Sequence, residues 1–137
     1  TMKANFEGAV NVWKVVQPHL APHANMVVVS SQLATRGSPH GADYAASKAA
    51  LSTWARSLAL AVGPEGKRVN VLAPGYVDTD ILAGDSDEKR NQRIQEVPLK
   101  RIGTGDDMAS IVSFLLSNDA AYITGSVLHA NGGLYLP

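Results

Sequence analysis

Hydrophobic residues recur at intervals of three and four between residues 2 and 20, as Phe6, Val10 and Trp13 illustrate. This spacing predicts an amphipathic helix that ends near Pro22. Three further segments have helical composition or spacing, namely 45–62, the charged stretch 85–96, and 104–117, which has Thr104 as its predicted N-cap.

Three short apolar runs, bounded by polar or turn-forming residues, predict strands at 26–29, 68–73 and 126–130. The first is entirely β-branched after its methionine, which is typical of a strand buried on both faces of a parallel sheet. Glycine and proline predict a loop over 32–42. The elements alternate between helix and strand, so the chain is predicted to be α/β, with right-handed crossovers and a parallel sheet of about three strands.

Composition narrows the class of protein. The 137 residues fit one domain, and twelve basic residues balance twelve acidic ones, which argues against a general nucleic-acid binder. The absence of cysteine excludes disulfides and thiolate metal sites, and the four histidines have no metal-ligand spacing, so no metal site is predicted. Apolar runs reach about five residues where a membrane helix needs about 20, so we expect no membrane association and a cytoplasmic protein.

Tyr44 and Lys48 stand at positions i and i+4 near the start of the predicted helix 45–62, so they share one face of it. A lysine ammonium near a tyrosine favours the phenolate and lowers the phenol pKa, which makes the pair a plausible proton-transfer device. Such pairs also occur by chance. Ser30-Ser31 and Pro74-Gly75, however, follow two of the predicted strands, and ligands of parallel α/β sheets bind at the carboxyl ends of strands.

The segment Val-Val-Val-Ser-Ser, the Tyr-Ala-Ala-Ser-Lys run and the downstream Arg-Val-Asn-Val-Leu-Ala-Pro-Gly-Tyr-Val-Asp-Thr resemble the short-chain dehydrogenase/reductase family. Asn5-Phe6-Glu7-Gly8, the stretch 98–103, and Asn131-Gly132-Gly133 resemble further motifs of that family in the same order. The resemblance implies a three-layer, Rossmann-like fold and hydride transfer between NAD or NADP and a small-molecule carbonyl or alcohol.

The resemblance also implies roles for individual residues. Tyr44 would be the general acid and base, and Lys48 would lower its pKa and hold the nicotinamide ribose. Ser31 would hydrogen-bond the substrate oxygen, in preference to Ser30. Asn5 would hold a water that links Lys48 to solvent, although an asparagine in a first helical turn is often only a cap.

The family pattern places four residues along the cofactor. Pro74, Gly75 and Val77 would lie beside the nicotinamide, with the main chain of Val77 near the carboxamide. Thr79 would reach the carboxamide or the pyrophosphate, or else cap the following segment. A glycine has no side chain to obstruct the approach of a flat ligand.

The family's glycine-rich pyrophosphate loop has no counterpart here, because no glycines follow a strand at that spacing. Residues 1–137 therefore resemble the C-terminal part of one NAD(P)-binding domain, and the choice between NAD and NADP is left open. An alternative is a catalytically inactive fragment that folds or associates as an oligomer without cofactor. The helices 2–20 and 45–62 resemble those that build the family's homo-oligomers, which implies a dimer or a tetramer.

Overall fold

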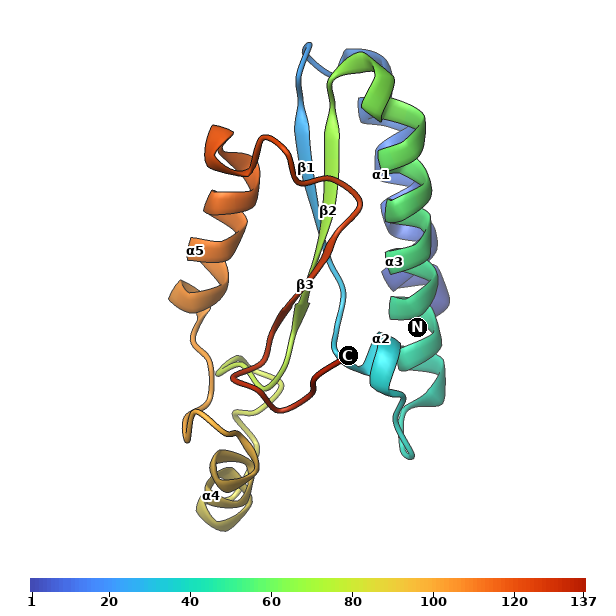
Figure 1. The fold of residues 1–137 in the computed structure, drawn as a ribbon. Helices are drawn as coiled ribbons and strands as arrows, with labels where there is room; N and C mark the ends of the chain where they lie inside the picture. The colour runs from blue at the N-terminus through green and yellow to red at the C-terminus, as the bar shows by residue number, and fades with distance from the viewer.

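The computed structural model describes Thr1–Pro137 as three parallel strands between two layers of helices (Figure 1). The strands are β1 (Asn25–Val29), β2 (Arg68–Pro74) and β3 (Val127–Ala130), and they lie side by side in the order β1-β2-β3. Helices α1 and α3 cover one face of the sheet and α5 covers the other. The predicted α/β class and the three parallel strands are confirmed.

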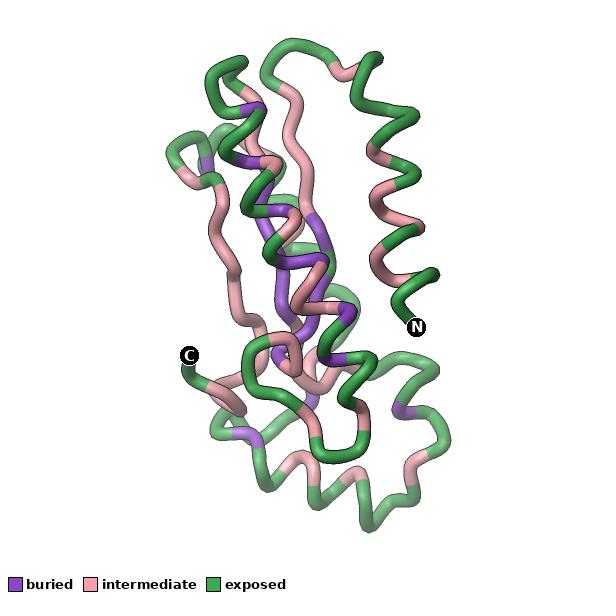
Figure 2. The backbone as a smooth tube through the Cα atoms, turned by 90° about the vertical axis from the view of Figure 1, so that its right-hand side faces the viewer, coloured by how far each residue is buried: buried purple, intermediate pink, exposed green.

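The core lies between the sheet and α3 (Ala42–Val62). Its buried apolar residues come from both elements and are Val28, Leu51, Ala55, Ala59, Val62, Val69 and Val71. Buried residues run along α3 and β2, whereas α1 (Gly8–Val16) has no fully buried residue (Figure 2). Trp54 joins the two helices, because Phe6 and Trp13 meet its ring edge-on at centroid distances of 6.3 and 6.5 Å.

The first helical region is less regular than predicted. A π-helical turn (Lys3–Glu7) precedes α1, and a 3₁₀ turn (Gln17–His19) follows it. The predicted extent of 2–20 is therefore nearly right, but the prediction of one uniform helix is wrong. The α-helical part ends just before Pro18, whose missing N–H cannot continue the hydrogen-bond ladder.

The prediction of a loop over 32–42 is also partly wrong, because it contains the short helix α2 (Leu33–Arg36). The N–H of Leu33 donates to Oγ of Ser31 at 3.2 Å, which supports the start of the helix. Gly37, with φ of 80°, ends it, so the first glycine of this stretch is a helix terminator.

The remaining two helices each begin with a side-chain cap. In α4 (Asp87–Glu96), Oγ of Ser86 accepts the N–H of Lys89 at 3.2 Å. In α5 (Gly105–Leu116), Thr104 and Asp107 form a reciprocal capping box, which confirms Thr104 as the N-cap. None of the helices combines the length and apolar character needed to cross a membrane.

Arg68 ties the far end of α5 to the sheet. Its guanidinium donates to the carbonyl oxygens of Leu115 and Ser117, each at 2.9 Å, and to that of Ile123 at 3.2 Å. Two of these carbonyls belong to the last turn of α5 and its C-cap, where a positive charge is favourable. The first residue of β2 thus fixes the helix that covers the opposite face of the sheet.

Candidate active site

The carboxyl ends of all three strands lie at one end of the sheet, the lower end in Figure 1, where α3 begins. The pairing of β1 with β2 continues beyond Val29. The N–H of Ser30 donates to the carbonyl of Leu72 at 2.8 Å, and the N–H of Gln32 donates to that of Pro74 at 3.0 Å. Ser31 and Pro74, which come from different strands, are thereby brought to the same edge.

The two serines after β1 have different hydrogen bonds. The hydroxyl of Ser52 donates to Oγ of Ser30 at 2.7 Å, and the hydroxyl of Ser30 donates to the carbonyl oxygen of Lys48 at 2.9 Å. Ser31 accepts the N–H of Leu33, and its own hydroxyl proton has no acceptor within the chain. Ser30 therefore fastens β1 to α3, while Ser31 keeps a donor for a ligand.

Tyr44 and Lys48 lie in the first turns of α3, which begins at Ala42 and not at 45 as predicted. Asp43 in that first turn interacts favourably with the positive end of the helix dipole. The Lys48 Nζ lies 5.8 Å from the centroid of the Tyr44 ring and donates to the carbonyl oxygen of Val29 at 3.0 Å. Burial lowers the pKa of Lys48 from its ordinary value of 10.5.

The reactive ends of this pair are open to a ligand. The Tyr44 side chain is partly exposed and its hydroxyl makes no hydrogen bond within the chain. An ammonium has three donors, and Lys48 uses one of them on Val29. The pair therefore has a phenol and at least one N–H available for a substrate or cofactor.

Asn5 reaches α3 through Ser47 and does not contact Lys48 directly. Its side-chain N–H donates to Oγ of Ser47 at 3.1 Å, and the Ser47 hydroxyl donates to the carbonyl oxygen of Tyr44 at 2.7 Å. Asn5 lies inside the π-helical turn and is not a cap. Ser47 is fully buried and was not singled out from the sequence, where a serine in an alanine-rich helix gives little signal.

Gly75 requires glycine because of a neighbour within the protein. A Cβ at this position would lie 2.6 Å from Cβ and 2.9 Å from Cα of Asn131. The N–H of Gly75 also donates to the carbonyl of Ala130 at 3.0 Å, which holds the ends of β2 and β3 close together. The sequence interpretation, a glycine that clears the way for a ligand, overlooked this contact between the ends of β2 and β3.

The main chain of Val77 is free, although both of its neighbours are bonded. Gly103 donates its N–H to the carbonyl of Tyr76 at 2.9 Å and accepts the N–H of Asp78 at 2.8 Å. Val77 itself has one N–H and one C=O without a partner in the chain. Thr79 is exposed, and its hydroxyl is unpaired; its carbonyl accepts the N–H of Leu82 at 2.9 Å, so the turn is closed by main chain and not by a Thr79 cap.

These groups fit a nicotinamide. A carboxamide has both an acceptor and donors, which match the free N–H and C=O of Val77. Lys48 has spare donors for ribose hydroxyls, and Pro74 and Gly75 form the turn that leads from β2 to Val77. The arrangement can therefore present a proton donor, an oxyanion donor and a carboxamide partner at one edge of the sheet.

Helix α4 adds contacts that the sequence did not predict. Arg90 binds the carboxylate of Asp78 through two bonds of 3.1 and 2.9 Å. Arg93 lies 4.7 Å from the centroid of the Tyr76 ring, and the Tyr76 hydroxyl donates to Glu96 at 2.9 Å. The pKa of Tyr76 is raised, first by burial and then by the Glu96 carboxylate.

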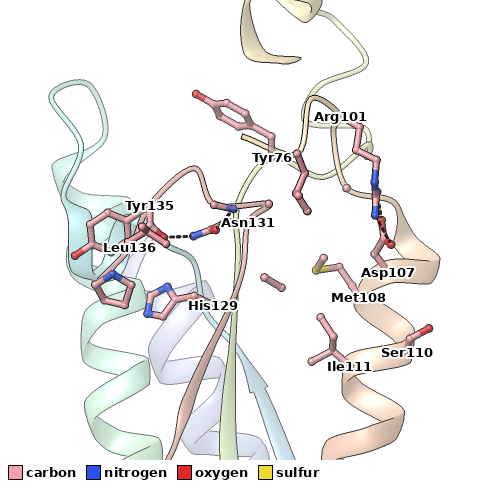
Figure 3. A pocket seen from close by; sticks show the side chains of 16 residues that line it. Tyr76, Arg101, Asp107, Met108, Ser110, Ile111, His129, Asn131, Tyr135 and Leu136 are labelled. Atoms are coloured by element: carbon pink, nitrogen blue, oxygen red, sulfur yellow. Dashed lines mark hydrogen bonds and ion pairs between the residues drawn. The ribbon is translucent and has the colours of Figure 1, made fainter. Parts of the chain in front are cut away.

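A cavity of about 490 Å³ lies beside this region, between the carboxyl end of β3, the start of α5 and the C-terminal residues. Figure 3 shows Tyr76 at its rim, Met108 and Ile111 on the α5 side, and Asn131 and Tyr135 on the β3 side. Ser31, Tyr44 and Lys48 do not line it. The hydroxyl groups of Ser31 and Tyr44 and the amine of Lys48 therefore lie outside this cavity.

Comparison with known proteins identifies the family. The family model described as enoyl-(acyl carrier protein) reductase matches residues 1–135. The 3-oxoacyl-[acyl-carrier-protein] reductase of Escherichia coli (strain K12) is 42% identical over 114 residues, 83% of this chain and 47% of that protein. Its counterpart from Chlamydia muridarum is 40% identical over 121 residues, 88% of this chain and 49% of that protein.

Solved structures agree. The short-chain dehydrogenase/reductase of Brucella melitensis described as a glucose/ribitol dehydrogenase superposes with a TM-score of 0.95 at 31% identity, over 100% of this chain and 56% of that one. A blue fluorescent protein from a metagenomic library, solved with NADPH, gives a TM-score of 0.91 at 31% identity over 99% and 55%.

The chain spans about half the length of the curated relatives it matches, and these relatives are oxidoreductases. The matched half holds all the motifs quoted from the sequence, from Asn5 to Gly133. The chain belongs to the short-chain dehydrogenase/reductase family, and its parallel strands with flanking helices are part of that family's Rossmann-like fold.

Proposed function

We propose that the protein carrying this chain is an NAD(P)-dependent oxidoreductase that interconverts a carbonyl compound and a secondary alcohol, with Tyr44 as general acid and base. The observation that carries the proposal is the set of free hydrogen-bonding groups at one end of the sheet. The Tyr44 hydroxyl, the spare donors of Lys48 and the Ser31 hydroxyl are all unused by the protein itself. Their types match the needs of carbonyl reduction.

Each of the three side chains has a part in proton transfer. In reduction, the Tyr44 hydroxyl gives its proton to the substrate oxygen, while Ser31 donates a hydrogen bond to the same atom. The Lys48 ammonium stabilises the phenolate left on Tyr44. In oxidation, the phenolate takes the proton from the alcohol. A bound nicotinamide supplies or accepts the hydride at the carbon.

The cofactor would be held by residues of α3 and of the segment that follows β2. Val77 would bind the carboxamide through its main chain, Pro74 and Gly75 would lie beside the ring, Thr79 would bind the carboxamide or pyrophosphate, and Lys48 would bind the ribose. The preference between NAD and NADP remains open in this half of the domain. One structural neighbour was solved with NADPH, so NADPH is the first cofactor to test.

Asn5 enters the proposal as a residue that keeps the first helix in register with α3. Its bond to Ser47 holds Asn5 against α3. As the family resemblance implies, a water held by Asn5 would link Lys48 to solvent. The substrate class is suggested by relatives named as 3-oxoacyl-[acyl-carrier-protein] reductases. A 3-oxoacyl thioester is therefore the first carbonyl compound to test.

The experiment compares Tyr44→Phe with Tyr122→Phe in the full-length protein. Both changes remove one phenolic oxygen, but Tyr122 is fully exposed and far along the sequence from the site. We expect Tyr44→Phe to lower kcat about 10²- to 10⁴-fold, as loss of a general acid does, and Tyr122→Phe to leave it unchanged. Full activity in Tyr44→Phe contradicts the proposal.

A second experiment tests the alternative of an inactive fragment. The 137-residue chain is expressed alone and titrated with NADPH and NADH by fluorescence. Because the chain spans about half the length of its relatives, we expect it to bind these nucleotides much more weakly than a protein of the relatives' length. Micromolar binding by the isolated chain contradicts the alternative.

A further inference from the structure

Helix α4 is attached to the rest of the protein mainly through polar side chains. None of its residues is fully buried, and it lies beyond the carboxyl end of the sheet in Figure 1. Arg93 donates to Asp85 at 2.6 Å, and Asp85 is nearly buried. Arg90 and Asp78 are both partly exposed. The charged side chains of α4 thus bind the segment that follows β2.

The two residues held by α4 are the two that flank Val77. Tyr76 lies under the guanidinium of Arg93 and donates its hydroxyl to Glu96. Asp78 is bound at both carboxylate oxygens by Arg90. On the opposite side, the main chain of Gly103 bonds the same two residues.

The position of Val77 is therefore fixed without any hydrogen bond to its own main chain. Its neighbours are held by side chains from α4 and by main-chain bonds from Gly103, while its own N–H and C=O remain free. Beyond Pro74 the segment no longer belongs to the sheet, and Val77 keeps only an isolated bridge to Gly103. A single bridge restrains a three-residue segment weakly, so the contacts with α4 add to the restraint on the position of Val77.

We propose that α4 is a clamp for the cofactor-binding main chain, in which Arg90, Arg93 and Glu96 are positioning residues that act on Val77 through Asp78 and Tyr76. The clamp holds the free N–H and C=O of Val77 in the orientation that a nicotinamide carboxamide requires. The inference rests on the proposed function, because it assigns to Val77 a partner that only a nicotinamide cofactor would bring.

The charges of the site support this role. The Arg90 side chain holds the pKa of Asp78 below its ordinary range, so the carboxylate stays ionised throughout the neutral range. Arg93 does the same for Asp85. Exposed ion pairs contribute little one at a time, but the contacts of α4 with Tyr76 and Asp78 act together on the two neighbours of one ligand-binding residue.

The experiment measures two affinities in the full-length protein, that of the nicotinamide cofactor and that of the matching ADP-ribose, which lacks the nicotinamide. For an NADP-dependent protein the 2′-phosphorylated ADP-ribose is used. We expect the double variant Arg90→Gln, Arg93→Gln to bind the cofactor about three- to tenfold more weakly, and ADP-ribose within about twofold of the original value. Lys89→Gln is the matched control, because it removes a charge from the same helix without touching a neighbour of Val77.

A charge exchange keeps the test valid if that variant folds poorly. Asp78→Arg or Arg90→Asp alone should weaken cofactor binding, and the two together should restore it at least in part. Hydrogen exchange over residues 74–80 should rise in Arg90→Asp and fall again in the double exchange, while exchange in α3 stays constant.

The outcomes separate the two proposals. If the unaltered protein binds no nicotinamide cofactor, the proposed function itself fails. The clamp is refuted, and the proposed function stands, if the unaltered protein binds cofactor and the arginine variants bind it equally well. The same conclusion follows if the variants lose as much affinity for ADP-ribose as for the cofactor.

Discussion

Gly75→Ala tests whether the packing of β2 against Asn131 dictates the glycine. The added methyl would lie 2.6 Å from Cβ and 2.9 Å from Cα of Asn131, where carbon atoms ordinarily remain about 3.5–4 Å apart. One of the two obstructing atoms belongs to the main chain and cannot rotate away. The ends of β2 and β3 must therefore separate.

The expected cost follows from that separation. Overpacking of this kind costs about 1–3 kcal/mol. The hydrogen bond from Gly75 to Ala130, now 3.0 Å, would lengthen and lose up to about 1 kcal/mol. We expect a total loss of about 2–4 kcal/mol in the free energy of unfolding, with no contribution from backbone strain, since Gly75 does not have a positive φ.

The assay is denaturant unfolding of the full-length protein without ligand, followed by a double-mutant cycle with Asn131→Gly. For a protein as long as its relatives, the melting temperature should fall by about 5–15 °C. Asn131→Gly is destabilising on its own, because its side chain accepts the N–H of Gly133 and donates to the carbonyl of Tyr135. In combination the loss should be smaller than the sum, since one of the two clashing atoms is gone.

The control is Gly84→Ala, where no atom lies within 4 Å of the added methyl and the stability should change by less than about 1 kcal/mol. Unchanged stability in Gly75→Ala, or strict additivity with Asn131→Gly, would refute the packing explanation. A loss of cofactor affinity without a loss of stability would instead favour the interpretation drawn from the sequence.

Three further predictions concern the surroundings of the site. Arg68→Met should destabilise the protein by about 2–4 kcal/mol in chemical unfolding, because three carbonyls around the end of α5 lose a charged donor. Asp107→Asn should reduce stability at neutral pH. Arg101 lowers the pKa of Asp107 in the folded protein, so the ionised carboxylate stabilises the fold above the unfolded pKa of about 3.9. This stabilisation is lost as the pH falls through the folded pKa, and the original protein and the variant should then become equally stable. Val15→Lys, at an exposed valine of α1, should lower the oligomeric state seen by light scattering if the helix pair forms the homo-oligomer interface that we expect.

Much of the fold could be predicted because its signals are local. The β-branched run of β1 and the apolar run of β2 need only their own residues to indicate strands, and both strands are present. The expected burial of β1 on both faces is wrong, because β1 lies at the edge of the sheet, is mostly half-buried and exposes Val29. Thr104 could be assigned as a cap because the acceptor and the Asp107 that completes the box are three residues apart. The position of Tyr44 relative to Lys48 follows in the same way from helical spacing.

The errors arise where a glycine or proline has a partner that the sequence does not reveal. Gly37 was taken as part of a loop, yet it terminates a short helix that Ser31 helps to begin. Gly75 was explained by a ligand, yet Asn131 already occupies the space. A glycine indicates that the main chain turns sharply or that another group lies close to it. Only the three-dimensional structure shows which of these applies and which group is the neighbour.

The ion-pair partners of α4 in the segment after β2 could not be predicted from the sequence either. Arg90 and Asp78 are twelve positions apart, and the mixed charges of 85–96 are equally compatible with pairing within that stretch, as Lys89 and Asp85 do pair. What selects the longer connection is a turn at 79–82, in which the N–H of Leu82 donates to the carbonyl of Thr79 and the leucine side chain is buried. Of the apolar run Ile81-Leu82-Ala83, Leu82 is the buried residue and Ile81 is exposed, a difference that the sequence alone does not reveal. The turn precedes the helix whose arginines contact the two neighbours of Val77. The partners of a charged helix thus depend on where the chain folds back, and the charge pattern of the helix alone does not specify that place.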